Sequence, residues 1–396
     1  MPQTDAYDRL RILLDSVPDH RKSRGRRHPL ADVLFIMLVG VVCGQEDAEA
    51  IEDFANANKE WFERRCGLRH GIPSQDTYLR VLAGMDPDAF SKAFRAWVDD
   101  LWQLAETRHV AIDGKTLRRS FDRAAGLSAL HSVAAFVSDS GLVIGSVPVE
   151  SRENEITAIP ALLQLLDLDG ATVTIDAIGC QTAIAAQIHD AKGKYLLQVK
   201  DNQPTLRENL DGFFRDAERP VRPLDDPKPL IERVTAEVEK GHGRLEKRTA
   251  EVSHDLSWIE KPDAWPGLAA VVRVSRSTID LTTGAERVGR ALYISNDPTL
   301  DATRALELSR RHWAIENEMH WILDVTFDED QSRIRKGNAA KNFAIILRAG
   351  LNLVTTAPSP KNGTSKISAA RRRRIAGLDA NYREAVLRLE PLSASS

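Results

Sequence analysis

The chain has 396 residues, of which 42% are hydrophobic and 28% charged, so it has the composition of a soluble globular protein and the length for two or three domains. The formal net charge of −3 gives no support for a nucleic-acid partner, and the distribution of charge matters more than its sum. Three cysteines without paired or metal-type spacing argue against a disulfide framework and suit a reducing cytoplasm. The apolar run at residues 33–42 is too short to span a membrane, and the first residues carry no export signal.

Basic residues gather in two short clusters, residues 20–28 and residues 371–374. Either cluster alone is typical of a solvated surface segment. Because the two clusters flank the acidic residues described below, we interpret them as phosphate contacts. In the first cluster the candidates are Arg24, Arg26 and Arg27.

Residues 1–105 show helical periodicity. Their aromatic side chains fall on the apolar faces of the expected helices, which indicates a core rather than a binding surface. The segment therefore predicts an N-terminal helical domain with a basic leading arm, suited to DNA binding but without a specific helix-turn-helix pattern. The predicted helices cover residues 30–42, 48–62, 77–82 (with Ser74 as its cap) and a segment that starts near residue 87.

Strands and helices follow one another from residue 110 onward. A hairpin turn joins the second and third strands, and right-handed crossovers make the later strands parallel, so we predict a mixed sheet covered by helices. In that arrangement the first and fourth strands lie side by side. The predicted strands cover residues 110–113, 131–137, 142–149, 172–176 and 195–199, and the predicted helices cover residues 156–166, 181–190 and 204–214.

A β-rich insertion is predicted at about residues 218–298, after a proline-rich entry. Beyond it, residues 300–327 are predicted to form one long helix and residues 338–354 another. Residues 356–396 form a basic tail, as a short charged helix or a disordered segment. The strands expected in the insertion cover residues 233–238, 245–252, 269–276 and 290–295.

Three acidic residues lie on elements that suit a metal site. Asp113 ends the first strand, Asp176 ends the fourth, and Glu316 lies within the predicted long helix. Carboxylates with phosphate oxygens are the usual ligands of Mg²⁺, and two such ions can act on the attacking and leaving oxygens of a phosphodiester. Metal-free structural roles are the alternative, but carboxylates brought together repel unless a cation compensates them. The set therefore predicts metal-dependent cutting and joining of nucleic acid.

Two histidines and two tryptophans surround Glu316. His312, Glu316 and His320 recur every four residues and share one face of a helix, a pattern that can be read as a zinc site but lacks the HExxH spacing. We favour packing or phosphate contact for the histidines. For Trp313 and Trp321 we favour core or interdomain packing over base stacking.

Further basic residues lie near the acidic ones in sequence and are candidate phosphate ligands, with solvated surface charge as the alternative for each. Together with His312 and the arginines of the leading arm, they complete the predicted DNA contacts. These residues are Lys115, Lys200, Arg244, Arg333, Arg335 and Lys336.

Six motifs occur in a fixed order along the chain: 111–115 (AIDGK), 153–160 (ENEITAIP), 174–177 (TIDA), 195–203 (YLLQVKDNQ), 241–244 (GHGR) and 312–317 (HWAIEN). This ordered set resembles the DDE transposases of bacterial insertion sequences, of the ISAs or H-repeat-associated type, over about residues 15–355. The wider class often has Arg four positions before the glutamate and Lys seven positions after it. Here these positions hold His312 and Leu323.

The resemblance implies an α/β fold, a ribonuclease-H-like mixed sheet with a β-rich insertion, preceded by the N-terminal helical domain. The catalytic domain would cover residues 106–355. Asp113, Asp176 and Glu316 fall on the catalytic triad, and Glu155, by itself a helix-capping residue, would lie near it.

The resemblance also implies two Mg²⁺ ions (with Mn²⁺ as a substitute), double-stranded DNA with terminal inverted repeats as partner, a homodimer that pairs two DNA ends, and a bacterial, nucleoid-associated location. A domesticated DNA-binding relative and a nuclease that nicks without joining are the rival interpretations.

Overall fold

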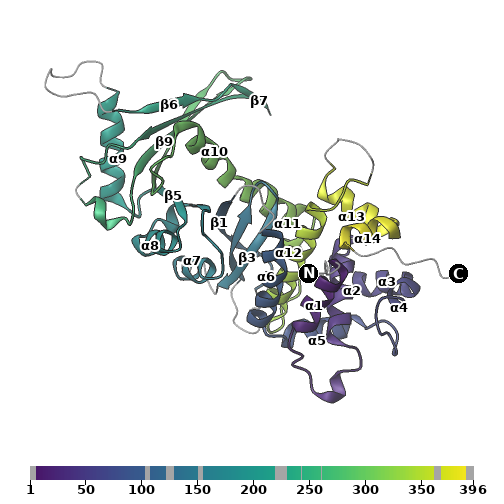
Figure 1. Cartoon of the computed structure of the whole chain (residues 1–396). Helices are drawn as coiled ribbons and strands as arrows, with labels where there is room; N and C mark the ends of the chain where they lie inside the picture. The colour runs from purple at the N-terminus through teal and green to yellow at the C-terminus, as the bar shows by residue number, and fades with distance from the viewer. Residues whose placement is uncertain are drawn as a thin grey trace, which may run out of the picture. The chain divides into compact units, whose positions relative to one another are not determined.

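The computed structural model describes residues 6–102, 108–121, 129–149, 155–218, 230–241, 243–259, 261–360 and 367–388. The chain divides into two compact units. Unit 1 comprises Met1–Glu106, Gly114–Asn154 and Glu316–Ser396, and unit 2 comprises Thr107–Asp113 and Glu155–Ile315. Strand β1 (His109–Thr116) runs through both units, so each unit contains one part of it (Figure 1).

The helices of unit 1 surround α2 (Leu30–Val42), in which every residue is buried, as its nearly continuous apolar sequence predicts. Its one acidic residue, Asp32, accepts hydrogen bonds from Arg11 Nη1 at 2.6 Å and from the Gly67 amide at 3.0 Å. Helix α12 (Ala339–Thr355) packs against α2 and α5. The remaining helices of the N-terminal region are α1 (Ala6–Ser16), α3 (Ala48–Ala57), α4 (Lys59–Glu63), α5 (Gln75–Gly84) and α6 (Pro87–Trp102).

Unit 1 also contains the hairpin of β2 (His131–Val137) and β3 (Leu142–Val149), which pair antiparallel as predicted. The turn places Gly141 at φ +67°, a conformation that favours glycine. The buried Asn352 of α12 bonds both backbone groups of Val143, accepting from its amide at 2.8 Å and donating to its carbonyl at 2.9 Å. These bonds satisfy backbone groups at the pairing irregularity next to Phe136.

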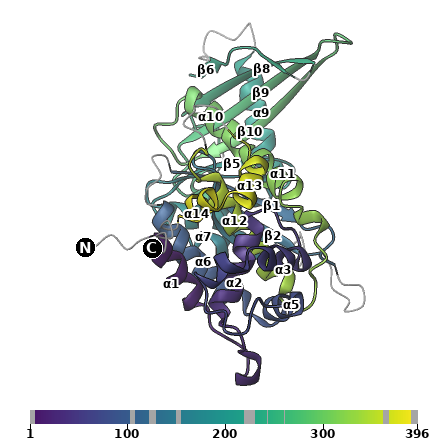
Figure 2. The same ribbon diagram turned by 90° about the vertical axis from the view of Figure 1, so that its right-hand side faces the viewer.

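The C-terminal segment forms two helices, α13 (Ala369–Leu378) and α14 (Ala380–Leu387), seen in yellow in Figures 1 and 2. Arg373 is 3% exposed, and its guanidinium lies over the Phe327 ring and donates to the Val41 carbonyl at 3.0 Å. Burial lowers the pKa of Arg373 to about 10. Arg372 donates to three carbonyls at the end of α12. The expectation of phosphate contacts is therefore wrong for these two arginines, which hold the C-terminal helices to the core.

Unit 2 is built on a mixed sheet in the order β1-β4-β5-β10-β9-β8-β6. Strands β1, β4 and β5 are parallel to one another, and β10 pairs antiparallel with β5. The strands of the predicted insertion thus continue the same sheet, and Figure 2 shows the long strands β8, β9 and β10 side by side. The strand bounds are β4 (Thr172–Ile175), β5 (Lys194–Val199), β6 (Glu232–Thr235), β7 (Glu239–Gly241, paired with β8), β8 (Arg244–Ser253), β9 (Ala270–Asp280) and β10 (Glu286–Ser295).

Helices cover this sheet in the predicted alternation. Side chains of β8, β9 and α10 form one buried apolar cluster, which includes Ala250, Val272 and Leu306. Together with the N-terminal helical region and the β2–β3 hairpin, the mixed sheet confirms the predicted α/β fold class. The helices of unit 2 are α7 (Glu155–Leu163), α8 (Thr182–Asp190), α9 (Pro204–Ala217) and α10 (Ala302–His312).

The predicted single helix over residues 300–327 is wrong. Helix α10 ends at His312, a π-helical turn covers Ile315–His320, and α11 covers Trp321–Val325. A π-helical turn follows a period of more than four residues, so the four-residue spacing of His312, Glu316 and His320 does not place them on one face. Within the described part of the chain, no helix is long and apolar enough to cross a membrane.

Candidate active site

The two aspartates of the predicted triad lie at neighbouring positions in unit 2. Strands β1 and β4 are parallel, and the last paired residues in their register are Ile112 and Ile175. Asp176 directly follows β4, at the carboxyl edge where open α/β sheets place their sites. Asp113 is the next residue of β1 after the paired Ile112, but β1 continues to Thr116, so the prediction that Asp113 ends its strand is wrong. Lys200 follows the neighbouring strand β5 at the same edge and is exposed.

The environment of Asp176 disfavours its ionised form. Burial raises the pKa of Asp176, and the carboxylate of Glu155 raises it further, whereas the Ile178 amide and Lys200 act in the opposite direction. Glu155 itself is 6% exposed at the start of α7, which packs against the turn that follows Asp176. A desolvated carboxylate beside a second one is stabilised by a bound cation. This edge of unit 2 is therefore suited to a metal ion.

The turn after Asp176 is fixed by side chains to which the sequence assigned no role. Asp176 caps the turn by accepting a hydrogen bond from the Ile178 amide at 3.1 Å. Asn202 donates to the Ala177 carbonyl at 2.6 Å, and Gln203 donates to the Cys180 carbonyl at 3.0 Å. Both residues follow β5 within the motif at residues 195–203, and the pairing of β4 with β5 brings them to this turn. Asn202 and Gln203 come just after a strand predicted to be parallel, and this position is the sequence feature that could have identified them as residues near the site.

Glu316 is the second residue of the π-helical turn, and its side chain is exposed. Ile315, the last residue of unit 2, and Met319 of unit 1 are both fully buried. Trp313 and Trp321 are 51% and 56% exposed, so neither belongs to a core, and the alternative of interdomain packing stays a prediction. π-Helical turns occur frequently at functional sites, and this one displays Glu316 on the surface.

A threonine hydroxyl of β4 joins the buried His109 to the half-buried His312. Thr174 Oγ1 lies 3.0 Å from His109 Nε2 and 3.1 Å from His312 Nδ1. Burial lowers the pKa of His109 to about 3 and that of His312 to about 4. Both imidazoles are therefore neutral at pH 7, and the Nδ1 atom of His312 is engaged inside unit 2.

These two histidines make the stability of the protein depend on pH. Their folded pKa values lie below the unfolded value of about 6.5, so the unfolded state binds more protons as the pH falls below 6.5. Stability is expected to fall by about 1.4 kcal/mol per pH unit for each histidine until the folded pKa is reached. Urea unfolding at pH 7 and pH 5 measures the loss. His109→Gln should reduce the loss by about 2 kcal/mol, whereas the same change at the exposed His189 should leave it unaltered. An unchanged pH dependence in His109→Gln would contradict this assignment.

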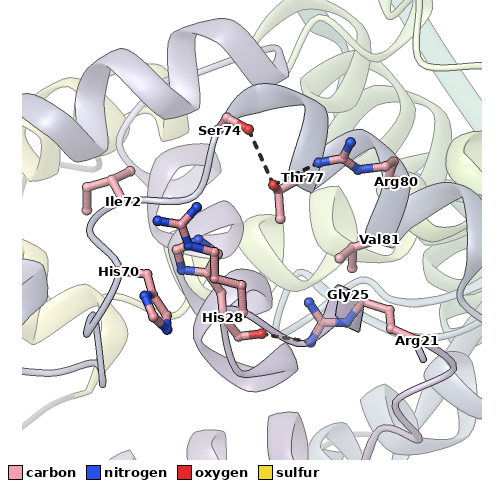
Figure 3. A pocket seen from close by; sticks show the side chains of 10 residues that line it. Arg21, Gly25, His28, His70, Ile72, Ser74, Thr77, Arg80 and Val81 are labelled. Carbon is pink, nitrogen blue, oxygen red and sulfur yellow. Dashed lines mark hydrogen bonds between the residues drawn. The ribbon is translucent and has the colours of Figure 1, made fainter. Parts of the chain in front are cut away.

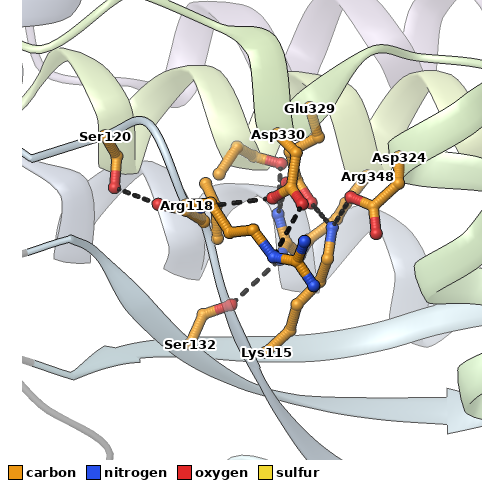
Figure 4. A network of polar contacts seen from close by, with 10 residues as sticks. Lys115, Arg118, Ser120, Ser132, Asp324, Glu329, Asp330 and Arg348 are labelled. Carbon is orange, nitrogen blue, oxygen red and sulfur yellow. Dashed lines mark hydrogen bonds and ion pairs between the residues drawn. The ribbon is translucent and has the colours of Figure 1, made fainter.

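Lys115 is a buried ion-pair partner in unit 1, so its predicted phosphate contact is wrong (Figure 4). Its ammonium pairs with Asp324 and lies 2.6 Å from Glu329 Oε2. Arg348 Nη1 lies 2.9 Å from the other oxygen of Glu329, and Arg348 Nη2 donates to Ser132 Oγ at 3.0 Å. Burial alone would raise the pKa of Glu329, but Arg348 and Lys115 outweigh it and hold that pKa below its usual value.

The other predicted DNA contacts lie in several parts of the chain. Arg26 is exposed, but its guanidinium donates to the carbonyls of Asp19 and Arg21. Arg244 is exposed at the start of β8, and the side chain of Arg24 lies outside the described residues. The remaining four residues line two cavities of unit 1 and are Arg27, Arg333, Arg335 and Lys336.

The donor set of the aspartate pair fits a divalent ion, because Mg²⁺ and Mn²⁺ prefer carboxylate oxygens. Glu316 is the first residue of the last segment of unit 1, so the three acids are divided between the two units. Among the residues that the structure describes, no three His, Cys, Asp or Glu side chains form a ready-made metal site.

Comparisons with known proteins agree with the motifs. Residues 12–98 match the family described as "DDE_Tnp_1-associated", and residues 104–353 match the family described as "Transposase DDE domain". "Putative transposase YncI" of Escherichia coli O157:H7 is 38% identical over 94% of this chain and 92% of its own length. "H repeat-associated putative transposase YhhI" of Escherichia coli K12 is 34% identical over 94% of this chain and 95% of its own length. The piggyBac transposase synaptic complex with hairpin DNA matches with a TM-score of 0.43 at 12% identity, over 98% of this chain and 83% of that chain. The chain belongs to the DDE transposase family, whose members cleave and transfer DNA strands with the help of divalent metal ions.

Proposed function

We propose that this chain is an insertion-sequence transposase in which Asp113, Asp176 and Glu316 hold two Mg²⁺ ions, with Mn²⁺ as a substitute. The observation that supports the proposal is the register of β1 and β4, in which Asp113 and Asp176 each come directly after the last paired residues, Ile112 and Ile175. The exposed Glu316 on a π-helical turn supplies the third carboxylate. When bound, two such ions activate the attacking oxygen and stabilise the leaving oxygen of a phosphodiester.

The protein's own part in this reaction is to hold the carboxylates and bind the DNA. Asn202 and Gln203 fix the turn that carries Asp176, so its oxygens are positioned before DNA binds. We propose that the partner is double-stranded DNA with terminal inverted repeats and a target duplex, that a homodimer pairs the two ends, and that the protein works at the bacterial nucleoid. The N-terminal helical domain (residues 1–105), the catalytic domain (residues 106–355) and the basic C-terminal segment are the corresponding parts of the chain.

A strand-transfer assay tests the proposal. The inverted repeats that flank the gene serve as donor DNA and a plasmid as target, with Mg²⁺ or Mn²⁺ present. We expect nicked donor ends and then joined products, because the carboxylate set suits both ions. Removal of the metal with EDTA should abolish both products and leave DNA binding in place, since phosphate contacts do not require the metal.

The same assay separates the two rivals. Binding without any product would show a domesticated DNA-binding protein, and nicks without joined products would show a nuclease. Products that persist in EDTA would contradict the metal role of the three acids. The outcome thus decides between transposition, binding alone and hydrolysis alone.

A further inference from the structure

Unit 1 contains two basic cavities that share one residue, Arg80 of α5. The first, of about 780 Å³, is lined by Arg21, Arg27 and Arg80 among others (Figure 3). The second, of about 880 Å³, is lined by Arg80 together with the basic segment at residues 333–336. Arg80 is exposed, and its Nη2 donates to Thr77 Oγ1 at 3.3 Å (Figure 3). The two cavities therefore adjoin at Arg80 within a single compact unit.

The first cavity is a preformed site. Asp19 holds Arg21 through two hydrogen bonds, Nε to Oδ1 at 2.9 Å and Nη2 to Oδ2 at 3.0 Å, and Nη2 also donates to the His28 carbonyl at 2.8 Å. The side chain of Arg21 is 10% exposed, and its remaining nitrogen, Nη1, is buried and makes no hydrogen bond with any described residue. The Arg21 guanidinium therefore lines this cavity in an orientation that Asp19 and the His28 carbonyl fix.

The second cavity is held rigidly against α5. The Asn338 amide donates to the Ala83 carbonyl at 3.1 Å, and the Asn342 side chain donates to the Leu82 carbonyl at 2.8 Å. Gly337 has φ +57°, and a Cβ there would lie 2.7 Å from the Ala83 carbonyl oxygen. Glycine thus lets the basic segment lie directly on the end of the helix.

Arg335 is oriented within this segment by an aromatic contact. Its guanidinium lies 5.1 Å from the centre of the Phe121 ring. Its Nε atom is buried and, like Arg21 Nη1, has no hydrogen-bond partner among the described residues. Each cavity is therefore lined by an arginine that a neighbouring group orients, Arg21 by Asp19 and Arg335 by the Phe121 ring. Asp76 is the acidic residue that lines the second cavity, and it is exposed.

We propose that this surface, from Arg21 and Arg27 through Arg80 to residues 333–336, is a track that binds the phosphate backbone of double-stranded DNA. Successive phosphates supply a row of acceptors, which matches arginines spread over two adjoining cavities better than one small anion does. The inference rests on the proposed function and deepens it, because it identifies where unit 1 binds DNA. It assigns the central DNA contact to Arg80, which lies between Arg21 and Arg27 on one side and residues 333–336 on the other.

Salt-dependent binding of the full-length protein to a mixed-sequence duplex tests the track. Fluorescence anisotropy gives Kd over a series of salt concentrations for the wild type, Arg80→Gln and the control Arg64→Gln. Arg64 is an exposed arginine at the end of α4 that lines neither cavity. We expect Arg80→Gln to weaken binding and to reduce the slope of log K against log salt by about one, because one phosphate contact is lost. Arg64→Gln should match the wild type.

The outcomes separate the track from the catalytic proposal. Equal slopes for Arg80→Gln and Arg64→Gln, with tight wild-type binding, would overturn the track and leave the catalytic proposal standing. A reduced slope for Arg80→Gln in a protein that yields no cleavage products would support the track and count against the catalytic proposal. A wild-type protein that binds no duplex would overturn both. Equal thermal unfolding of the two variants, expected because both arginines are exposed, confirms that binding is compared between folded proteins.

Discussion

Asp176→Asn is expected to reduce DNA strand cleavage by on the order of a thousandfold or more, since loss of a metal ligand removes several kcal/mol of transition-state stabilisation. Asparagine keeps the side-chain oxygen that accepts from the Ile178 amide, so the turn after β4 should remain folded. The change removes the negative charge and little else. DNA binding should stay the same or improve, because one carboxylate less repels the phosphates.

Asp190→Asn is the matched control, because Asp190 is an exposed aspartate at the end of α8 in the same unit. Cleavage and joining are measured for both variants on the same donor duplex, with binding measured in parallel. The control should retain wild-type rates. If Asp176→Asn retained more than about a tenth of the wild-type rate, a difference under about 1.4 kcal/mol, Asp176 would not be a metal ligand.

The arrangement of the aspartates could be predicted from the sequence because the strand signals were strong. The segments that contain Val110 and Val173 are short, apolar and β-branched, and they are followed by an aspartate. Helical connections between later strands require parallel pairing, and parallel strands end at the same edge. The observed pairing of β1 with β4 follows from these two rules. Local pattern and chain topology were sufficient for this part of the fold.

The interruption of the long helix could not be predicted in the same way. Residues 300–327 have apolar positions that fit an α-helical period, and a π-helical turn changes that period by less than one residue. What distinguishes the turn is tertiary packing, since Ile315 and Met319 are both buried. Tertiary packing also decides the exposure of Trp313 and Trp321, for which the apolar pattern predicted core or interdomain packing.

The roles of the basic residues were also beyond prediction from the sequence. A lysine two residues after an aspartate on a strand, such as Lys115, has the same local pattern whether it faces DNA or a buried carboxylate. Its partners Asp324 and Glu329 are 209 and 214 residues away in sequence. Arg373 likewise meets its acceptor Val41 only in the folded chain. Long-range pairing, which leaves no local signal, decides whether such a charge is structural.

Arg348→Met is expected to destabilise unit 1 by about 3–5 kcal/mol, the usual cost of removing one partner of a buried ion pair. Arg348 is 1% exposed, and Glu329 would remain buried with Lys115 as its cationic partner. Methionine fills much of the same volume, so the loss reports charge and hydrogen bonding more than packing. Urea unfolding at pH 7 measures it. Arg118→Met is the control: Arg118 is 84% exposed and 3.5 Å from Asp330, and such surface pairs contribute at most about 1 kcal/mol.

The pH dependence of the Arg348→Met loss identifies its cause. In the wild type the pKa of Glu329 is lowered, so the stability that this carboxylate contributes is present above its unfolded pKa and is lost as the pH falls through the folded pKa. In the variant the carboxylate has lost one cation, and protonation relieves its burial. The difference between wild type and variant should therefore shrink as the pH is lowered from 7 to 4. Arg348→Lys keeps a cation beside Glu329 but cannot also reach Ser132 with a second nitrogen, so it should show a smaller loss with the same trend. A loss that is equally large at both pH values would point to packing instead of the unpaired carboxylate.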